Sequence, residues 1–478
     1  MSSTLRDKNK WLVMIYLAGD NNLSEECVFD LMEMKRANLH EDVVVVAALD
    51  SGIHDGTRVT IRKNSTPGEL RKDLEISQEN ESAKREDFTY LDKILNFIEE
   101  SITLYEGRRY ALILSGHGSG SIGNFLSKED SDRIMSLSVP ALADLLWKVS
   151  QNERLASGKL DILGLDSCLM SMTEIAYAVR NHAKIMIGAE GFEPLAGWPY
   201  KDVLEQFKPV NKSEEELAKH IVTTYINYYT DYQAAGISVD QAACDLSKID
   251  NLTDAVQSLS LKLQEYLPQN QVRNAIVLAH WEAQSYKNEQ YTDLYDFCHL
   301  LKNNCEVVDV RTACQNVMNT IHGSQMEGKN ANDAEANFSH VDGFVLKSCY
   351  SGLTVQYSRG VSIYFPWAEN KSELDAYEKL EFANNSGWFN FLKHYLRVTR
   401  REPRPGVGKV RNFDQPGLPK TEPAVTVVSS FHRNGSENKN GSENKNGSEN
   451  KNIGKGVGSM RNPPTTFFDC ADCSRSDT

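Results

Sequence analysis

Continuous apolar runs, rather than alternating ones, recur along the first 190 residues of the chain. Five of them are rich in β-branched residues: Trp11–Ala18, Val43–Leu49, Tyr110–Leu114, Leu160–Leu165 and Ile185–Ala189. Strands that are buried on both faces have this pattern, which is typical of a parallel sheet. Amphipathic stretches lie between them, at Ser24–Asn38, Asp87–Tyr105, Val139–Val149 and Ser171–Asn181. This alternation predicts βαβ units and an α/β fold, a three-layer α/β/α sandwich around a mostly parallel sheet.

The pattern changes in the second half of the chain. Residues 208–322 read as mainly helical, with one strand-like interruption near Ile237–Leu246, and a polar loop follows at Gly323–Ser339. Further elements are then expected as strands at Gly343–Ser348, Thr354–Tyr357 and Val361–Phe365 and as a helix at Trp388–Leu396. We therefore predict a core at 1–207, a helical region at 208–342 packed on it, and a return to the core at 343–400. A small hairpin running from Asp50 to Arg62 is expected at one edge of the sheet.

Residues 401–478 have a different character. Three tandem copies of Asn-Gly-Ser-Glu-Asn-Lys begin at Asn434, Asn440 and Asn446. A polar repeat without apolar positions cannot bury a core, so we predict a flexible, disordered tail.

Composition narrows the classes of function. The 478 residues are 40% hydrophobic and 25% charged, with a net charge of −14, which is typical of a soluble globular protein. The acidic excess disfavours a nucleic-acid partner, because neutralising phosphates needs a basic face. The first apolar run has eight residues, too short for a membrane span, and no cleavable signal is visible. We expect a cytoplasmic protein without a membrane partner, although export by a non-standard route stays open.

Two chemically capable side chains follow two successive predicted strands. Tyr110–Leu114 leads into Ser-Gly-His117-Gly, and Leu160–Leu165 leads into Asp-Ser-Cys168. Functional residues of open parallel sheets collect at the carboxyl ends of strands. One helical crossover separates the two strands, so they can be neighbours about 4.8 Å apart, within which a thiol and an imidazole could meet. A structural cysteine and a turn histidine are the alternative, but their joint position favours nucleophilic catalysis.

The surroundings of Cys168 favour an activated thiol. Ser171-Met-Thr-Glu174 has the capping-box pattern of a helix start, and a helix N-terminus stabilises a thiolate. Glycines around His117 leave backbone N–H groups free, and we expect the Gly118 and Cys168 amides to bind an oxyanion. No metal site is predicted, since the C-x-x-C at Cys470 lacks a second pair of ligands.

At these residues the chain resembles the clostripain family of cysteine peptidases, within the caspase, gingipain and legumain group. The resemblance runs from Trp11 to about residue 395. It rests on five blocks in order: Ala18–Leu23, Ser115–Gly118, Asp166–Met170, Glu193–Tyr200 and Gly360–Pro366.

The resemblance implies a caspase-like fold and a cysteine endopeptidase with a Cys–His dyad, His117 and Cys168, that has no obligatory third member. It implies cleavage after Arg or Lys, and thus peptide or protein substrates with basic residues. Asp166 occupies the position of the acid that holds the basic side chain, with a turn or capping role as the alternative. Glu190 and Glu193 could add to the negative field, and Trp198 could form a pocket wall or belong to the core.

Relatives are often self-cleaved between the histidine and cysteine strands. Here that loop, Ser121–Leu137, carries Lys128 and Arg133, and the resemblance implies cleavage after one of them. Some relatives need calcium, for which this loop offers an acidic cluster of Glu129, Asp130 and Asp132, although a solvated loop is the commoner reason for such a cluster. The thiol chemistry itself requires no cofactor.

Two other functions remain open from the sequence. A transferase would use the same thiol and pass the acyl group to an amine instead of water. A catalytically silent scaffold would use the helical region 208–322 as a docking surface, but it would need neither His117 nor Cys168.

Overall fold

The computed structural model describes residues 11–50, 57–61, 90–105, 107–130, 133–155, 157–207, 213–287, 289–323, 337–339 and 342–399. These residues all fall within one unit of the chain. The predicted tail at 401–478 lies outside the described residues. The boundaries at 207, 342 and 400 stay predictions.

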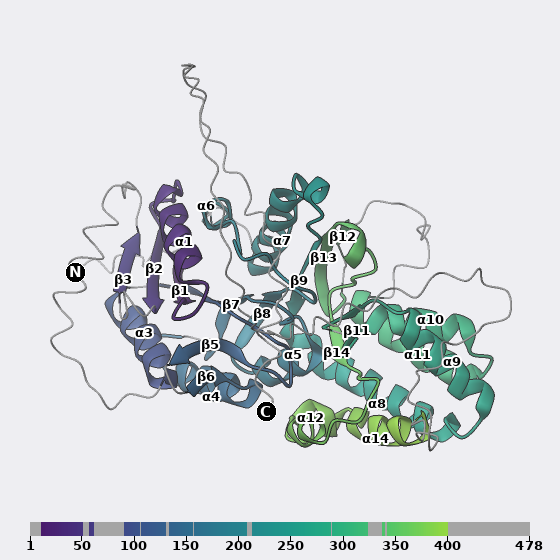
Figure 1. Cartoon of the computed structure of the whole chain (residues 1–478). Coiled ribbons are helices and arrows are strands. Elements are labelled where there is room, and N and C mark those ends of the chain that lie inside the picture. Colours follow the sequence, from purple (N-terminus) through teal and green to yellow (C-terminus); the bar gives the residue numbers. More distant parts are fainter. Residues whose placement is uncertain are drawn as a thin grey trace, which may run out of the picture. The chain divides into compact units, whose positions relative to one another are not determined.

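Nine strands form the main sheet in the order β12-β13-β9-β8-β7-β4-β1-β2-β3 (Figure 1). They are β1 (Trp11–Ala18), β2 (Val43–Asp50), β3 (Thr57–Ile61), β4 (Arg109–Ser115), β7 (Leu160–Asp166), β8 (Ala183–Gly188), β9 (Val239–Asp245), β12 (Asn337–Ser339) and β13 (Val345–Ser351). The central strands β2, β1, β4, β7 and β8 pair in parallel. The remaining strands pair antiparallel at the two sides of this centre. The predicted parallel centre and the edge hairpin at β2–β3 are therefore confirmed.

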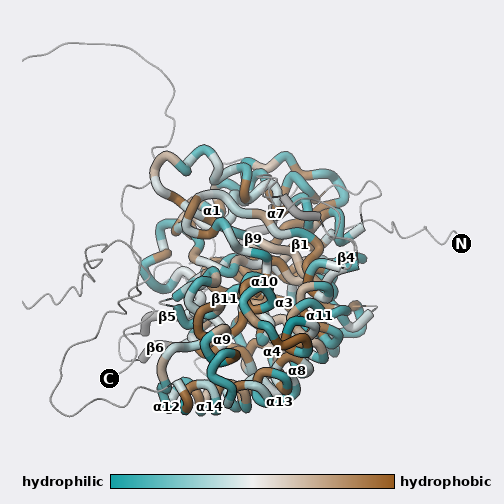
Figure 2. The backbone as a smooth tube through the Cα atoms, turned by 90° about the vertical axis from the view of Figure 1, so that its right-hand side faces the viewer, coloured by the Kyte–Doolittle hydropathy of each residue, from teal (hydrophilic) through white to brown (hydrophobic). Residues whose placement is uncertain are grey.

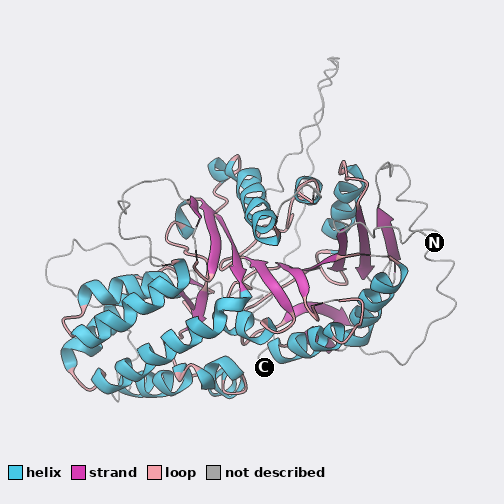
Figure 3. Cartoon of the chain, turned by 180° about the vertical axis from the view of Figure 1, so that it is seen from behind, coloured by secondary structure: helices cyan, strands magenta, loops and turns pink. Residues whose placement is uncertain are grey.

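Both faces of the central strands are buried, because helices cover each face (Figures 1 and 3). One face carries α1 (Ser24–Arg36), α6 (Tyr200–Leu204) and α7 (Glu214–Thr230), and the other carries α3 (Tyr90–Leu104), α4 (Val139–Ser150) and α5 (Thr173–Val179). Hydrophobic positions alternate with hydrophilic ones along many of the helices (Figure 2). This amphipathic pattern lets a helix bury one stripe against the sheet, which explains why the sequence forms three layers.

Besides the helices of these layers, the chain forms long helices that pack in pairs. They are α8 (Ile249–Tyr266), α9 (Asn270–Glu282), α10 (Leu294–Asn304), α11 (Val308–His322) and α14 (Trp388–Thr399), with the short α12 (Lys371–Tyr377) and α13 (Glu381–Asn385). A three-stranded sheet stands among them, formed by β10 (Ser285–Tyr286), β11 (Tyr291–Asp293) and β14 (Ser362–Tyr364). No helix within the described ranges is long and apolar enough to cross a membrane.

Several elements differ from the expectations. The strand expected at Thr354–Tyr357 is wrong, because the chain there forms a 3-10 turn at Leu353–Val355. The strand at Val361–Phe365 exists as β14, but it pairs with β11 in the small sheet rather than with the main one. The loop expected at Ser121–Leu137 contains a hairpin of β5 (Phe125–Asp130) and β6 (Arg133–Leu137). The pairing of β11 with β14 joins segments far apart in sequence, and β5 and β6 are short strands. The periodicity of apolar residues reveals neither kind of pairing.

Candidate active site

The ends of β4 and β7 bring the two predicted catalytic residues to neighbouring positions. Ser115 and Asp166 are Cα partners in the parallel ladder, and the Gly116 N–H donates to the Asp166 carbonyl at 3.2 Å. His117 and Cys168 each follow two residues later, so both lie just past adjacent strand ends. The predicted crossover through α4 thus places the two residues just past neighbouring strand ends, and the meeting of imidazole and thiol stays a prediction.

The two loops are in direct contact beyond the strands. The Ser167 hydroxyl donates to the Gly116 carbonyl at 2.7 Å. A side chain at Gly118 would place its Cβ 2.5 Å from the Cys168 carbonyl oxygen and 2.9 Å from the Ser167 Cβ. A Cβ does not fit at such distances, so the close approach of the loops requires glycine at 118.

The backbone around Gly118 turns its amide away from the neighbouring hairpin. Gly118 bridges Phe125 through the flanking bonds, in which Leu126 N–H donates to His117 O at 2.8 Å and Ser119 N–H donates to Asn124 O at 3.0 Å. Within the described part of the chain, neither the Gly118 nor the Cys168 N–H has a hydrogen-bond partner. This arrangement is compatible with the predicted oxyanion donors, whose role stays a prediction.

Cys168 is held against the loop that follows β8. Its side chain is 8% exposed, and Sγ accepts a hydrogen bond from the Glu193 N–H at 3.3 Å. The next residue, Leu169, has a φ of +64° and its N–H donates to Gly191 O at 2.9 Å. The cysteine therefore sits in a sharp turn that is pinned on both sides, with a backbone donor at its sulfur.

The expected capping box after Cys168 is wrong. Helix α5 begins five residues after the cysteine, its N-cap is Met172, and no side chain caps it. The Ser171 hydroxyl donates instead to Gly360 O at 2.7 Å, and the Glu174 carboxylate accepts from Tyr364 N–H at 2.8 Å. Contacts with the distant β14 segment thus outcompete the local cap. The backbone donor found at the thiol comes from another loop, not from a helix start.

His117 has a partner that the sequence analysis did not identify. Its Nε2 lies 2.5 Å from Oδ1 of Asn22, an exposed residue in the turn after β1. Asn22 lies in the Ala18–Leu23 block on which the family resemblance rests. Its place in that block was the one sign of a function in the sequence, and it did not indicate which function.

Asp166 lies beneath the loop that carries Glu193 and Trp198. It is 3% exposed, with Oδ1 accepting from Trp198 N–H at 3.1 Å and Oδ2 accepting from the Tyr200 hydroxyl at 2.7 Å. Burial raises the pKa of Asp166, against which these hydrogen bonds act. Gly197 closes over the carboxylate, since a Cβ there would lie 3.0 Å from Asp166 Oδ1.

Glu193 forms a carboxyl pair with Asp166. Each of the two carboxyl groups affects the pKa of the other, and Glu193 Oε1 also accepts a hydrogen bond from Trp198 Nε1 at 3.4 Å. Burial, followed by the charge of Asp166, raises the pKa of Glu193 well above its ordinary value. Two carboxyl groups in contact cannot both ionise cheaply, so the pair favours one shared proton or a neighbouring cation. Glu193 is the more exposed of the two.

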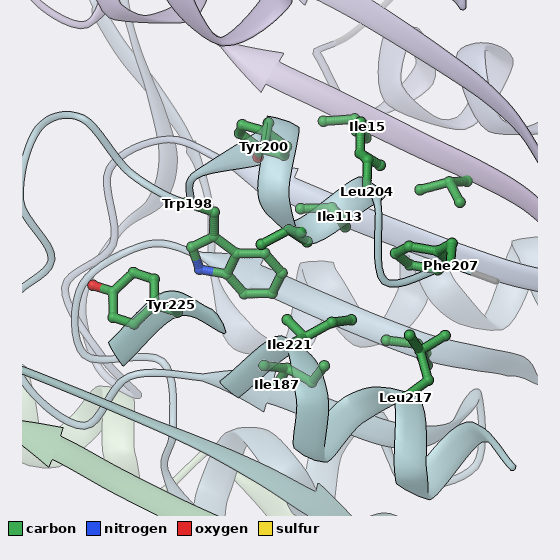
Figure 4. Packing of buried hydrophobic residues seen from close by; sticks show 14 of the residues in the cluster. Ile15, Ile113, Ile187, Trp198, Tyr200, Leu204, Phe207, Leu217, Ile221 and Tyr225 are labelled. Atoms are coloured by element: carbon green, nitrogen blue, oxygen red, sulfur yellow. The ribbon is translucent and has the colours of Figure 1, made fainter. Parts of the chain in front are cut away.

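Trp198 is a core residue in this structure. It is 0% exposed and belongs to the same hydrophobic cluster as Ile113, Ile187 and Tyr225, on the face of the sheet that carries α6 and α7 (Figure 4). Its ring approaches Gly164 so closely that a Cβ there would lie 2.9 Å from a ring carbon. Of the two interpretations left open by the sequence, the geometry favours the core. Through Nε1 the ring also holds Glu193 in place.

The side chain of Glu190 has different partners from that of Glu193. It is 1% exposed, and its Oε2 accepts from the Gly360 N–H at 2.6 Å. Burial, and then the charges of Asp293 and Asp240, raise its pKa well above the ordinary value. The Asp293 carboxyl beside it has its pKa raised to about 7, mainly by burial and then by Asp296. Glu190 thus belongs to an interior acid cluster that joins the loop after β8 to the segment before β14.

The predicted self-cleavage residues lie in the β5–β6 hairpin. The backbone of Lys128 pairs with Met135 and that of Arg133 pairs with Asp130. The side chains of 128–134 lie outside the described part, and so does Asp132 altogether, so the calcium ligands expected there stay a prediction. Elsewhere in the described residues no group of three or more acidic, histidine or cysteine side chains could hold a metal ion.

Known proteins match this chain over most of its length. The sequence profile of the clostripain family matches residues 15–395. Clostripain of Hathewaya histolytica is 20% identical over 452 residues, covering 82% of this chain and 81% of that protein. A secreted C11 cysteine protease from Bacteroides thetaiotaomicron, solved with an irreversible peptide inhibitor, superposes with a TM-score of 0.53 at 17% identity. It covers 80% of this chain and 99% of its own. A second structure of a secreted C11 protease from that organism gives a TM-score of 0.50 at 15% identity, over 79% and 99% of the two chains.

Proposed function

The chain belongs to the clostripain family of cysteine peptidases, and from that premise we propose that it cleaves peptide bonds after Arg or Lys with Cys168 as nucleophile and His117 as its base. The protein is a cysteine-type endopeptidase, a hydrolase that acts on peptides or proteins. The residues that carry the reaction and the basic preference are the proposed part.

One observation carries the assignment of the dyad. The Ser115–Asp166 register sets the two following loops side by side, so close that a Cβ at position 118 would lie 2.5 Å from the Cys168 carbonyl oxygen. In the proposed reaction His117 takes the thiol proton as Sγ attacks the substrate carbonyl, and then gives that proton to the leaving amine. Water, activated by the same imidazole, hydrolyses the thioester and frees the thiol. The amides of Gly118 and Cys168 would stabilise the negative charge on the carbonyl oxygen.

The Asp166–Glu193 pair supports the preference for a basic side chain. Both carboxyl groups have raised pKa values because burial disfavours their charge. A guanidinium or ammonium group would offset that cost and let the pair ionise. The pair is close to the proposed nucleophile, because the Glu193 backbone N–H donates a hydrogen bond to Cys168 Sγ and Asp166 precedes Cys168 by two residues. Glu193, as the more exposed partner, would meet the cation first, with Asp166 beneath it.

Self-cleavage after Lys128 or Arg133 belongs to the same proposal. Peptidases bind their substrates in extended form, and both residues already lie in extended β5 and β6. The pairing between these strands would have to open before either bond could enter the site.

Fluorogenic peptides test the proposal. We expect release from peptides that end in Arg or Lys and none from those that end in Asp, Asn or Leu. Cys168→Ala should abolish it, whereas Cys349→Ala, at another buried cysteine in β13, should retain it. Release after Asp or Asn would keep the nucleophile but remove the basic preference. Activity that survives Cys168→Ala would overturn the assignment of the nucleophile.

A further inference from the structure

We propose that Asn22 is a positioning residue that fixes the ring of His117 during the reaction, so that the catalytic group has three members rather than two. The inference rests on the proposed role of His117. It rests in addition on a contact between two loops that are 95 residues apart in sequence.

The contact links two neighbouring strand ends. β1 and β4 are parallel neighbours, with Leu17 opposite Ser115 at their carboxyl ends. His117 follows β4, and Asn22 lies in the turn after β1, where its Oδ1 is 2.5 Å from His117 Nε2. Cys168 follows β7, on the other side of β4. His117 therefore follows the middle one of three adjacent strands, with Asn22 after one neighbouring strand and Cys168 after the other.

The turn that carries Asn22 is held rigidly by its neighbour. Asn21 donates from Nδ2 to Ala18 O at 3.1 Å and to Ser127 O at 2.7 Å, and its Oδ1 accepts from Leu23 N–H at 2.8 Å. The backbone of His117 is tied to the same β5 hairpin through Leu126 N–H. The two asparagines thus have different contacts. Asn21 stabilises the turn, and the exposed side chain of Asn22 contacts His117.

The chemistry of the amide determines the tautomer. An amide oxygen only accepts hydrogen bonds, so His117 Nε2 must carry a proton, and Nδ1 is then the nitrogen that can receive one. When Nδ1 takes the proton of the thiol, the ring becomes an imidazolium whose Nε2–H bond to Asn22 is charge-assisted and stronger. When Nδ1 releases that proton to the leaving amine, Nε2 keeps its own. Asn22 therefore holds one orientation and one tautomer through both steps.

Substitutions at Asn22 separate positioning from folding. Asn22→Ala should lower kcat on the order of 10–100-fold and leave KM and the melting temperature unchanged. This loss is smaller than the full rate enhancement that a general base contributes, because His117 itself remains. Asn22→Asp keeps an acceptor, so it should recover activity, and its charge should move the acidic limb of the pH–rate profile to higher pH. Asn304→Ala, at an exposed asparagine ending α10, is the control and should behave as wild type. Equal kcat for wild type and Asn22→Ala would overturn the inference.

A second measurement keeps this inference distinct from the proposed function. In ¹⁵N-histidine spectra, with His117→Ala used for assignment, wild type should show the Nε2-protonated form of His117 and Asn22→Ala a mixture of tautomers. An unchanged tautomer in Asn22→Ala would overturn the inference even if the peptidase activity is as proposed. Failure of the wild type to cleave any basic peptide, with the tautomer shift present, would instead refute the proposed specificity alone.

Discussion

Ser115 and Asp166 face each other as Cα partners at the last rung of the parallel ladder between β4 and β7. This register aligns the two proposed catalytic residues, because His117 and Cys168 stand at the same offset beyond it. A slip of one residue in the pairing would turn every side chain of a strand to the opposite face. The apolar residues of β4 and β7 are buried on both faces, so the core that fixes the register also fixes the distance between the two loops.

Removing the Ser167 hydroxyl should loosen the two loops without touching the nucleophile. In Ser167→Ala the bond to Gly116 O is lost, which should lower the free energy of unfolding by about 1 kcal/mol. We expect kcat to fall several-fold while the thiol can still be alkylated. Urea unfolding and initial rates measure both effects. The control is Ser258→Ala, which removes a similar hydroxyl–carbonyl bond on the exposed surface of α8 and should leave kcat unchanged. Wild-type kcat in Ser167→Ala would contradict the coupling of the loops.

A methyl group at position 118 should separate the same loops by steric force. The added Cβ of Gly118→Ala would meet the Cys168 carbonyl, a backbone atom that cannot move aside cheaply. A displacement of about 1 Å at the reacting centre costs on the order of 100-fold in rate, so we expect kcat to fall by that factor.

Gly188→Ala is the matched control for that substitution. Its Cβ would have its nearest neighbour at 3.5 Å, an ordinary contact, so this variant should fold and remain active. Rates and thermal melting of both variants are compared. Full activity in Gly118→Ala would mean that the loops are not in contact during catalysis.

The central fold follows from the sequence because its signal is local and strong. Strands such as Trp11–Ala18 are continuous apolar runs with amphipathic helices between them, and both patterns are visible in a window of about ten residues. The positions of His117 and Cys168 at strand ends follow from the same pattern. The strand at Trp11–Ala18 has the expected bounds, and the ends of the other four differ from the expected ones by at most two residues.

The rest of the site depends on contacts that no local window contains. Asn22 meets His117 across 95 residues, and the Tyr291 hydroxyl donates to Ser119 O at 2.7 Å across 172. Glu174 looked like a helix cap but is drawn into the interior by Tyr364 and Tyr377. Tertiary packing determines such contacts. The residue types in the local sequence therefore predict them only weakly.

Asp166→Asn tests whether the buried acid serves the substrate or only the fold. Both carboxylate oxygens accept hydrogen bonds, from Trp198 N–H and from the Tyr200 hydroxyl, so an amide would set a donor against a donor. We expect the free energy of unfolding to fall by about 1–3 kcal/mol. Cleavage after Arg and Lys should fall at least ~100-fold, as the loss of about 3 kcal/mol of ion pairing predicts. Denaturant unfolding and kcat/KM for Arg, Lys and Leu peptides provide the readouts.

Tyr200→Phe supplies the comparison for Asp166→Asn. It removes one hydrogen bond and leaves the carboxylate, so it should cost about 1 kcal/mol of stability and keep the preference for basic residues. If Asp166→Asn is destabilised as expected but cleaves Arg peptides at the wild-type rate, Asp166 has a structural role only.

Glu190→Gln should change how stability depends on pH. The folded pKa of Glu190 lies well above its ordinary value of 4.5, so between these two values the folded state holds a proton that the unfolded chain has released. The free energy of unfolding of wild type must therefore fall as pH rises through that interval. The amide of Glu190→Gln resembles the protonated acid and does not titrate, so this part of the decline should disappear.

Denaturant unfolding at pH 5 and pH 8 measures the effect as a difference between variants. Asp293, whose pKa of about 7 gives a decline of the same sign, is present in both proteins, but it interacts with Glu190, so the comparison reports the titration of the two acids together. Between pH 5 and pH 8, the free energy of unfolding of Glu190→Gln should rise by at least about 1 kcal/mol relative to that of wild type, since one pKa unit corresponds to about 1.4 kcal/mol. Glu282→Gln, at an exposed carboxylate ending α9, should show no such gain. A constant difference across pH would mean that Glu190 is already ionised in the folded protein, and that the acid cluster is held together without its proton.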